Sequence, residues 1–248
     1  MHRRQLLKAM GALALCPLCA TAGLAKGPHW SYQGSTGPDK WGKLPIANNV
    51  CATGTQQSPL DIESPIRAEV PKLAIAWASH ADTIVNNGHT IELGFADGGT
   101  LRVGNDTYKL AQFHFHRPSE HLIDGKRAAM EVHFVHTIVG GYGVVGLLMA
   151  AGKPNAVFNK IVSTMPMKEG PPVKADPAID PSGLLPAGRD YFRYAGSLTT
   201  PPCAETVAWM VLTESIEVAD ADIASFAKLY PNNSRPAQKL NRRFLLRS

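Results

Sequence analysis

Histidines at strand spacing are the residues of this sequence best suited to chemistry. Five of its nine histidines lie between positions 114 and 136. The segment 112–116 alternates polar and aromatic residues, so in a β-strand Gln112, His114 and His116 would share one face. The same alternation over 131–136 puts His133 on one face, with Glu131 and Val135 beside it. Three neutral imidazoles and an open fourth position make a catalytic zinc site, so we predict Zn²⁺ at His114, His116 and His133.

The residues that would orient these ligands can be predicted by the same alternation. A ligating imidazole usually donates its other N–H to a carbonyl or a carboxylate. Gln112 and Glu131 each precede a predicted ligand by two residues and lie on its face. We therefore predict that Gln112 orients His114 and that Glu131 orients His133. We interpret His121 and His136 as buried core histidines.

A His-x-His pair alone is not specific, and two other metal folds must be weighed. Metallo-β-lactamase-type sites need an Asp followed by a His soon after the pair, where this chain has Pro118 and Ser119. Cupins are closer, because the spacing from His114 to Glu120 fits half of their first motif, although their second motif is not evident. A cupin-like metal oxygenase using iron or manganese is the alternative enzyme, and a non-catalytic zinc-binding protein is the alternative outside enzymes.

The elements around the histidines are predicted to be mostly strands. Short runs of β-branched and aromatic residues recur between Gly, Asn and Asp turns, which indicates a mainly β (α+β) fold with a large twisted, mostly antiparallel sheet. Two segments with helical periodicity, one capped by Asn155 and one by Asp220, predict a few short peripheral helices. The predicted strands are 82–85, 90–95, 100–103, 112–116, 130–137 and 144–149.

The N-terminus has the pattern of an export signal. Arg3, Arg4 and Lys8 precede the apolar run 9–15 and an Ala-rich stretch, which is typical of the twin-arginine type. The apolar run is too short to cross a bilayer, which needs ~20 residues. We predict a signal peptide over residues 1–25, a single domain over 26–248 and a periplasmic mature protein without a membrane segment.

Charge and cysteine content agree with an exported enzyme. The chain has 248 residues, 44% of them hydrophobic, which excludes a wholly disordered protein. Its formal charge is +5, and removal of residues 1–25 leaves 22 basic and 20 acidic residues, so no nucleic-acid partner is expected. The mature chain keeps only Cys51 and Cys203. In an oxidising compartment this pair predicts one disulfide, with two buried free thiols as the alternative.

Further motifs, in their order along the chain, make the sequence resemble an α-class carbonic anhydrase of the exported bacterial type. The resemblance extends over nearly all of the mature chain. It implies a small-molecule substrate, CO₂ or bicarbonate, and reversible hydration of CO₂ by attack of a zinc-bound hydroxide. The motifs are Trp30-Ser31-Tyr32, 57–62, Asn86-Asn87-Gly88-His89, Ser119-Glu120-His121, 196–202 and 233–238.

The resemblance also assigns catalytic roles. Thr199 would accept a hydrogen bond from the hydroxide and donate its own to Glu120, because a carboxylate can only accept. Thr200 would line the same polar wall. His89 would carry the proton to solvent, since a histidine titrates near neutral pH. Tyr32 and Asn87 would order the connecting waters.

The remaining expectations from the resemblance concern the substrate pocket, the disulfide and the assembly. Cys51 and Cys203 match the disulfide of secreted members, and a homodimer is expected because bacterial relatives often dimerise. Arg117 and Glu92 depart from the residues common in the family and would alter the pocket rim. The hydrophobic wall for CO₂ would consist of Val135, Val144, Leu198, Val207 and Trp209.

Overall fold

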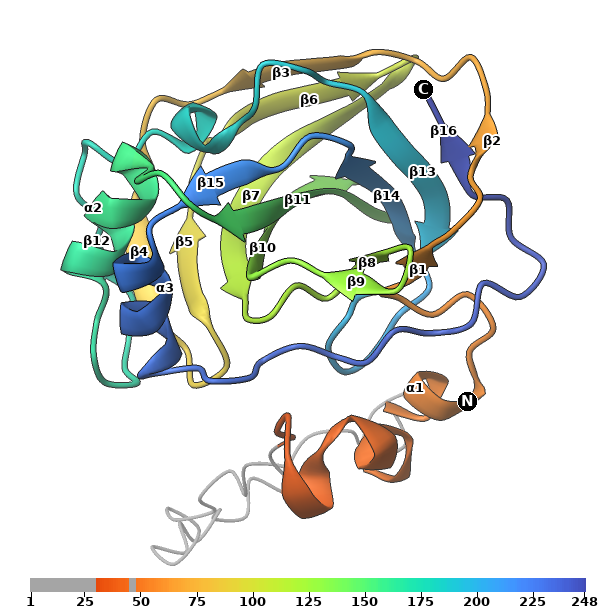
Figure 1. Ribbon diagram of the computed structural model, residues 1–248, viewed down its shortest axis with the longest axis horizontal. Helices are drawn as coiled ribbons and strands as arrows, with labels where there is room; N and C mark the ends of the chain where they lie inside the picture. The colour runs from red at the N-terminus through yellow and green to blue at the C-terminus, as the bar shows by residue number, and fades with distance from the viewer. Residues whose placement is uncertain (1–29, 45–47) are drawn as a thin grey trace, which may run out of the picture.

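A twisted β-sheet dominates the computed structural model, which describes residues 30–44 and 48–248 (Figure 1). The predicted export signal, residues 1–25, lies outside the described residues. The short helices α2 (Ala156–Thr164) and α3 (Asp220–Ala227) lie side by side at one edge of the sheet, and α1 (Val50–Thr53) belongs to the N-terminal segment below it. The predicted mainly β fold with few peripheral helices is confirmed.

The strands are numbered in chain order. Three 3₁₀ helices, Gly34–Thr36, Pro38–Lys43 and Pro181–Leu184, complete the described elements. The strands are β1 Asp61–Ile62, β2 Ile66–Arg67, β3 Leu73–Trp77, β4 Thr83–Asn86, β5 Ile91–Gly94, β6 Gly99–Val103, β7 Asp106–His116, β8 Leu122–Ile123, β9 Lys126–Arg127, β10 Met130–Ile138, β11 Gly141–Ala151, β12 Val173–Lys174, β13 Tyr191–Gly196, β14 Val207–Leu212, β15 Ile216–Val218 and β16 Leu246–Arg247.

Most neighbouring strands of the large sheet run antiparallel, as the sequence predicts. In the described part of the chain, its order is β12-β4-β5-β7-β10-β11-β14-β13-β16-β2, with β6 joining β3 to β7 and β15 beside β11. The parallel pairs of this sheet are β11 with β14, β11 with β15, and β16 with β2. Parallel neighbours need a long crossover, and the chain between β11 and β14 supplies one that carries α2 and β13.

The central strands β7, β10 and β11 separate two hydrophobic clusters. On one face, fully buried Phe113, Phe115 and Phe134 belong to the larger cluster. On the other face, Val135 and Trp209 belong to a smaller cluster. Each buried Phe side chain contributes roughly 2–3 kcal/mol to folding relative to an exposed one. This burial fixes which face of β7 and β10 carries the histidines, because a slip of one residue would put phenylalanines there.

The helices α2 and α3 begin for different reasons. Asn155 caps α2 as predicted, and its side chain accepts hydrogen bonds from the N–H groups of Val157 and Phe158. The predicted cap of α3 is wrong by one residue. Ala219 has the extended backbone of the N-cap position, and Asp220 lies in the first helical turn without capping. There its carboxylate still interacts favourably with the positive end of the helix dipole.

The buried His136 predicts that the fold loses stability in acid. Its Nδ1–H donates to the Gly143 carbonyl and its Nε2 accepts from Trp77, so it is neutral. Burial lowers its pKa to about 4. The unfolded chain binds this proton near pH 6.5, so stability present above that pH is lost as pH falls toward 4. We expect a loss of about 2 kcal/mol at pH 5 from this residue.

Urea denaturation at pH 7 and pH 5 measures this effect. His136→Gln can keep both hydrogen bonds but cannot titrate, so its stability should fall less between the two pH values than that of the parent chain. The exposed His80→Gln serves as the matched control. Equal acid losses in the parent and in His136→Gln would contradict the assignment.

Candidate active site

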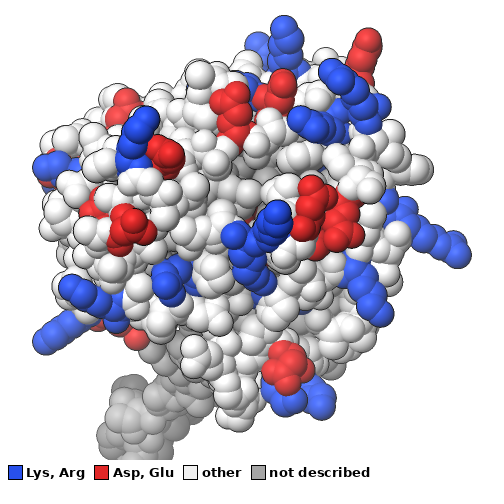
Figure 2. Space-filling view, viewed as in Figure 1, with Lys and Arg blue, Asp and Glu red and all other residues white. Residues whose placement is uncertain are grey.

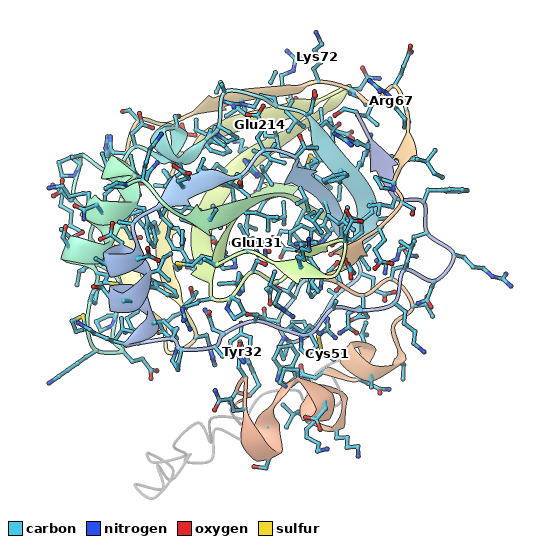
Figure 3. The ribbon with its side chains drawn as sticks, viewed as in Figure 1. Tyr32, Cys51, Arg67, Lys72, Glu131 and Glu214 are labelled. Atoms are coloured by element: carbon cyan, nitrogen blue, oxygen red, sulfur yellow. A yellow bond between two sulfur atoms is a disulfide. The ribbon has the colours of Figure 1, made fainter. Side chains whose placement is uncertain are left out.

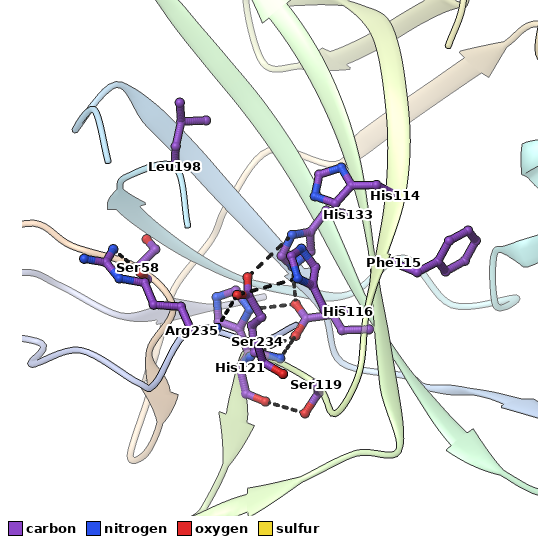
Figure 4. A network of polar contacts seen from close by, with 12 residues as sticks. Ser58, His114, Phe115, His116, Ser119, His121, His133, Leu198, Ser234 and Arg235 are labelled. Atoms are coloured by element: carbon purple, nitrogen blue, oxygen red, sulfur yellow. Dashed lines mark hydrogen bonds and ion pairs between the residues drawn. The ribbon is translucent and has the colours of Figure 1, made fainter. Parts of the chain in front are cut away.

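Two neighbouring strands bring the three predicted ligands together. His114 and His116 lie on β7, and His133 lies opposite His114 on β10. Their ring centroids are 4.5–5.4 Å apart, and one candidate ligand atom from each ring lies within 4.8 Å of the others. Figure 4 shows the three rings gathered on the side of the sheet opposite Phe115. The three residues could hold one metal ion.

Each of the three rings has one nitrogen held by the protein. His114 Nδ1 is 2.8 Å from Gln112 Oε1, His116 Nδ1 is 2.8 Å from the Asn233 carbonyl oxygen, and His133 Nε2 is 2.8 Å from Glu131 Oε1. The predicted pairing of Gln112 with His114 and of Glu131 with His133 is therefore what the structure shows. The nitrogens left over are His114 Nε2, His116 Nε2 and His133 Nδ1.

The leftover nitrogens fit a zinc ion. His116 Nε2 is buried and has no hydrogen-bond partner, which is costly for a polar atom unless it binds something. Burial lowers the pKa of all three rings, that of His116 to about 4, so they are neutral at pH 7. Three neutral nitrogens with oriented partners are the donor set that zinc takes in catalytic sites.

Glu131 is the most heavily bonded group at the site. It is fully buried within the sheet (Figure 3). Its Oε1 accepts from His133 Nε2 and His121 Nδ1, and its Oε2 accepts from the backbone N–H groups of Glu120 and His121. Burial opposes its ionisation, but the neighbouring His121 and His133 outweigh burial and hold its pKa well below the usual value. His121 is thus a buried, bonded core residue, as interpreted from the sequence.

Replacing Glu131 with Gln tests this arrangement. The amide NH₂ cannot accept, so about two of the four hydrogen bonds would be lost and His133 would be less firmly oriented. We expect the zinc affinity to fall by about 10–100-fold. Competition with a chromogenic chelator measures this, and Glu63→Gln, at an exposed position, is the control. Unchanged affinity in Glu131→Gln would show that the orientation of His133 does not depend on this carboxylate.

Glu120 and Thr199 lie next to each other beside the histidines. Glu120 Oε1 accepts from the Arg235 N–H, while Oε2 is buried without a partner and lies 3.9 Å from His133 Nδ1. The Thr199 hydroxyl is near enough to lower the pKa of Glu120, but the two side chains do not reach hydrogen-bond geometry. Burial dominates and raises the pKa of Glu120 to about 7.

The loop that carries Thr199 is held at both ends. At one end, the Ser197 hydroxyl oxygen accepts a hydrogen bond from the Ser58 N–H, and the Ser197 carbonyl accepts one from Trp209 Nε1. At the other end, the predicted disulfide is present and joins Cys203 to Cys51. Cys51 belongs to the N-terminal segment below the sheet (Figure 3). These contacts hold the Thr199 loop against β14 and the N-terminal segment.

Asn233 and Arg235 lie in a motif of the resemblance, but no role for either side chain is predicted from the sequence. Asn233 donates its amide to the His89 and Phe115 carbonyls and accepts from the Arg117 N–H, so it links the His89 turn to the end of β7. The buried Arg235 guanidinium donates to the Ser58 and Cys51 carbonyls. Neither side chain differs in type or spacing from an ordinary loop residue, so only the motif could have indicated them.

His89 lies on a turn at the edge of the site. Its ring stacks on Trp30 with centroids 3.6 Å apart. Asn87 Oδ1 accepts from the His89 and Thr90 N–H groups, so this side chain shapes the turn. Tyr32 packs edge-on against Trp30, and burial, followed by the nearby Glu120 carboxylate, raises its pKa. A pocket of about 250 Å³ lies between Trp30, Tyr32 and His89.

The residues predicted to form the apolar wall occur together. Trp209 contacts the His133 ring edge-on, with centroids 4.9 Å apart. Thr200, in the same loop as Leu198, is half-buried. Val135, Val144, Val207 and Trp209 are buried in one cluster, and Leu198 packs against it.

Arg117 and Glu92, the two departures from the family pattern, have different surroundings. The Arg117 guanidinium donates to the Pro231 carbonyl, close after α3. Glu92 lies directly opposite His114 on β5, and burial raises its pKa. Glu92 is therefore the cross-strand partner of a predicted ligand, whereas Arg117 follows a predicted ligand in the chain and its guanidinium reaches the loop after α3.

Three histidines that could hold one metal ion, carried on a twisted sheet, are the arrangement found in a class of mononuclear metal enzymes. Comparison with known proteins shows which family within this class the chain belongs to. The family model described as eukaryotic-type carbonic anhydrase matches residues 36–248, and the chain belongs to this family. It is 37% identical to a carbonic anhydrase of Nostoc sp. over 99% of this chain and 97% of the relative, and 39% identical to one of Neisseria gonorrhoeae over 94% of each.

Solved structures agree. The α-carbonic anhydrase of Thermovibrio ammonificans, determined in complex with the inhibitor sulfanilamide, superposes with a TM-score of 0.86 at 41% identity, over 89% of this chain and 99% of that one. The chain is therefore an enzyme of the carbonic anhydrase class, whose reaction is the hydration of the small molecule CO₂. Among the described residues, no helix is long and apolar enough to cross a membrane.

Proposed function

We propose that the chain catalyses the reversible, zinc-dependent hydration of CO₂, with the metal held by His114, His116 and His133. The observation that carries this proposal is the buried, unpartnered His116 Nε2 beside two oriented imidazoles. Zinc, when bound, supplies a nucleophile by lowering the pKa of a water molecule to about 7, a value known from carbonic anhydrases themselves.

Glu120 and Thr199 would orient the reacting oxygen. A Glu120 carboxylate can only accept, so a Thr199 hydroxyl brought into contact with it must donate to it. The lone pairs of Thr199 would then face the open side of the histidine site. Burial raises the pKa of Glu120, but the positive charge of a metal ion held by the histidines would favour its ionised form.

The apolar cluster would receive CO₂. The side chains of this cluster next to His133 are apolar, apart from the Trp209 indole, whose N–H already donates to the Ser197 carbonyl. The cluster includes Val135, Val144, Val207 and Trp209. An uncharged molecule can rest there without displacing strongly bound water. Leu198 and Thr200 would border this wall from the Thr199 loop.

His89 would carry protons between the site and solvent, with Tyr32 and Asn87 beside the water path. Replacing His89 with Ala should slow proton transfer by about tenfold or more while CO₂–bicarbonate interconversion itself changes little. Stopped-flow hydration measures the first rate, and free imidazole in the buffer should restore it. His80→Ala is the control. An unaltered rate in His89→Ala, without imidazole, would contradict the shuttle role.

The proposed location of the enzyme is outside the cytoplasm. We propose that residues 1–25 are a cleaved twin-arginine signal and that residues 26–248 form one domain. We also propose that the enzyme works in the periplasm, because its Cys51–Cys203 disulfide is consistent with an oxidising compartment. N-terminal sequencing of the periplasmic fraction tests this. Recovery of an uncleaved chain from the cytoplasm would contradict it.

The depletion of ¹⁸O from labelled CO₂, followed by mass spectrometry, tests the catalytic proposal. This exchange reports interconversion at chemical equilibrium and does not depend on buffer as a proton acceptor. We expect zinc-loaded protein to accelerate the exchange strongly. A folded, zinc-loaded chain that leaves the exchange at its spontaneous rate would be a zinc-binding protein and not a carbonic anhydrase.

A further inference from the structure

A second cavity lies apart from the histidine site. It is a groove of about 1000 Å³, formed by the β10–β11 turn, the ends of β13 and β14 and the C-terminal segment. It contains none of the three predicted metal ligands and shares only Val207 with the apolar wall. Cavities of this size accommodate organic ligands of the size of drugs or lipids. Its lining includes Tyr108, Ile138, Tyr142, Arg193, Phe244 and Leu246.

The rim of the groove exposes hydrophobic side chains. Val139, in the β10–β11 turn, is fully exposed, and Phe244 is 73% exposed. Both line the groove, together with the half-buried Ile138 and Tyr142. Exposed apolar residues gathered around a hollow, rather than scattered singly, are typical of a binding site.

One positive charge inside the groove has no counterion. Arg193, on β13, is half-buried and lines the groove, and in the described part of the chain its guanidinium takes part in no hydrogen bond or ion pair. Its titratable neighbours are the phenols of Tyr108 and Tyr191. Arg243 differs, because it donates to the carbonyls of Leu240, Ala195 and Lys239. An unpaired guanidinium between apolar walls offers two parallel N–H donors that match a carboxylate.

The surroundings of Arg193 favour an anion. Glu205 is the one acidic residue that lines the groove, and its Oε1 already accepts from the Gln56 N–H and from Gln57 Nε2. The segment 231–248 contains five basic residues and no acidic residue. Figure 2 shows blue side chains projecting from the edge of the molecule where β13, β16 and β2 lie. Arg242, exposed at the rim, adds to the positive potential.

We propose that this groove binds a fatty-acid carboxylate, with the carboxylate on Arg193 and the hydrocarbon chain along Ile138, Val139 and Phe244. Charge complementarity selects the head group, and the exposed apolar rim selects the chain. The site is separate from the histidines, so this binding does not depend on the proposed catalytic function.

Calorimetric titration of the purified protein with dodecanoate, below its micelle concentration, tests the proposal. We expect saturable binding of one equivalent, equal with zinc-loaded and zinc-free protein, which distinguishes the groove from a carboxylate bound at the metal. Arg193→Gln should weaken binding about tenfold or more, because it removes a charged hydrogen-bond donor. Phe244→Ser should weaken it several-fold.

Two ligand controls and one variant control complete the test. Dodecanol and acetate should each bind much more weakly than dodecanoate, and the exposed Arg102→Gln variant should bind dodecanoate like the parent.

Four results would overturn the proposal. Absence of saturable binding, or binding that Arg193→Gln leaves unchanged, would show that the groove is not a carboxylate site. Co-sedimentation with phosphatidylglycerol vesicles, without binding of free dodecanoate, would assign the face to a membrane surface. A dimer in analytical ultracentrifugation that Phe244→Ser dissociates, again without dodecanoate binding, would assign it to a second copy of the chain.

Discussion

Replacing His116 with Ala is expected to remove bound zinc and reduce CO₂ hydration by about a thousandfold or more, to near the spontaneous rate. The buried Nε2 of His116 would be lost from the donor set, and two imidazoles bind zinc far more weakly than three. Metal analysis after dialysis and stopped-flow hydration measure the two effects. Circular dichroism reports whether the variant folds.

Because His116 is buried, its removal also leaves a cavity and an unpaired Asn233 carbonyl, so a second variant is needed. His114 is half-buried, and His114→Ala should fold more readily while losing zinc as well. His80→Ala, on an exposed loop, is the matched control. Full zinc content and full activity in both His114→Ala and His116→Ala would contradict the assignment of the ligands.

Replacing Thr199 with Ala is expected to lower hydration by about a hundredfold while zinc binding stays intact. The Thr199 hydroxyl lies beside Glu120 and would orient the reacting oxygen. Thr199→Ser keeps the hydroxyl and should recover much of the rate. This pattern separates a positioning role from a ligand role.

The contrary outcomes for Thr199 are equally distinct. Loss of zinc in Thr199→Ala would mean that the loop supports the metal site itself. A rate unchanged in the Ala variant would show that the approach of Thr199 to Glu120 has no part in catalysis. Failure of Thr199→Ser to recover activity would place the effect in the packing of the methyl group.

Most of the candidate site could be predicted from the alternation of side chains along two strands. Because side chains of a strand alternate between faces, the spacing of Gln112, His114 and His116 was enough to place them together, and Glu131 followed by the same argument from His133. The placement of these side chains can be predicted because it depends on local backbone geometry. The capping of α2 by Asn155 succeeded for the same reason.

Contacts between distant segments could not be predicted in this way. Asn233 lies more than a hundred residues from His116 and His89, and nothing local shows that it links them. The stacking of His89 on Trp30 and the four hydrogen bonds to Glu131 likewise depend on tertiary packing. The cap of α3 was misplaced because Asp220 is a favourable residue both at the N-cap and in the first turn, and the sequence does not distinguish the two positions.

Stopped-flow hydration of CO₂ by the purified mature chain, before and after removal of zinc, tests the central claim most directly. The three-histidine assignment predicts rapid hydration that disappears when a chelator removes the metal and returns when one equivalent of zinc is restored. Hydration that is absent from the folded, zinc-loaded protein, or that persists undiminished without metal, would contradict it.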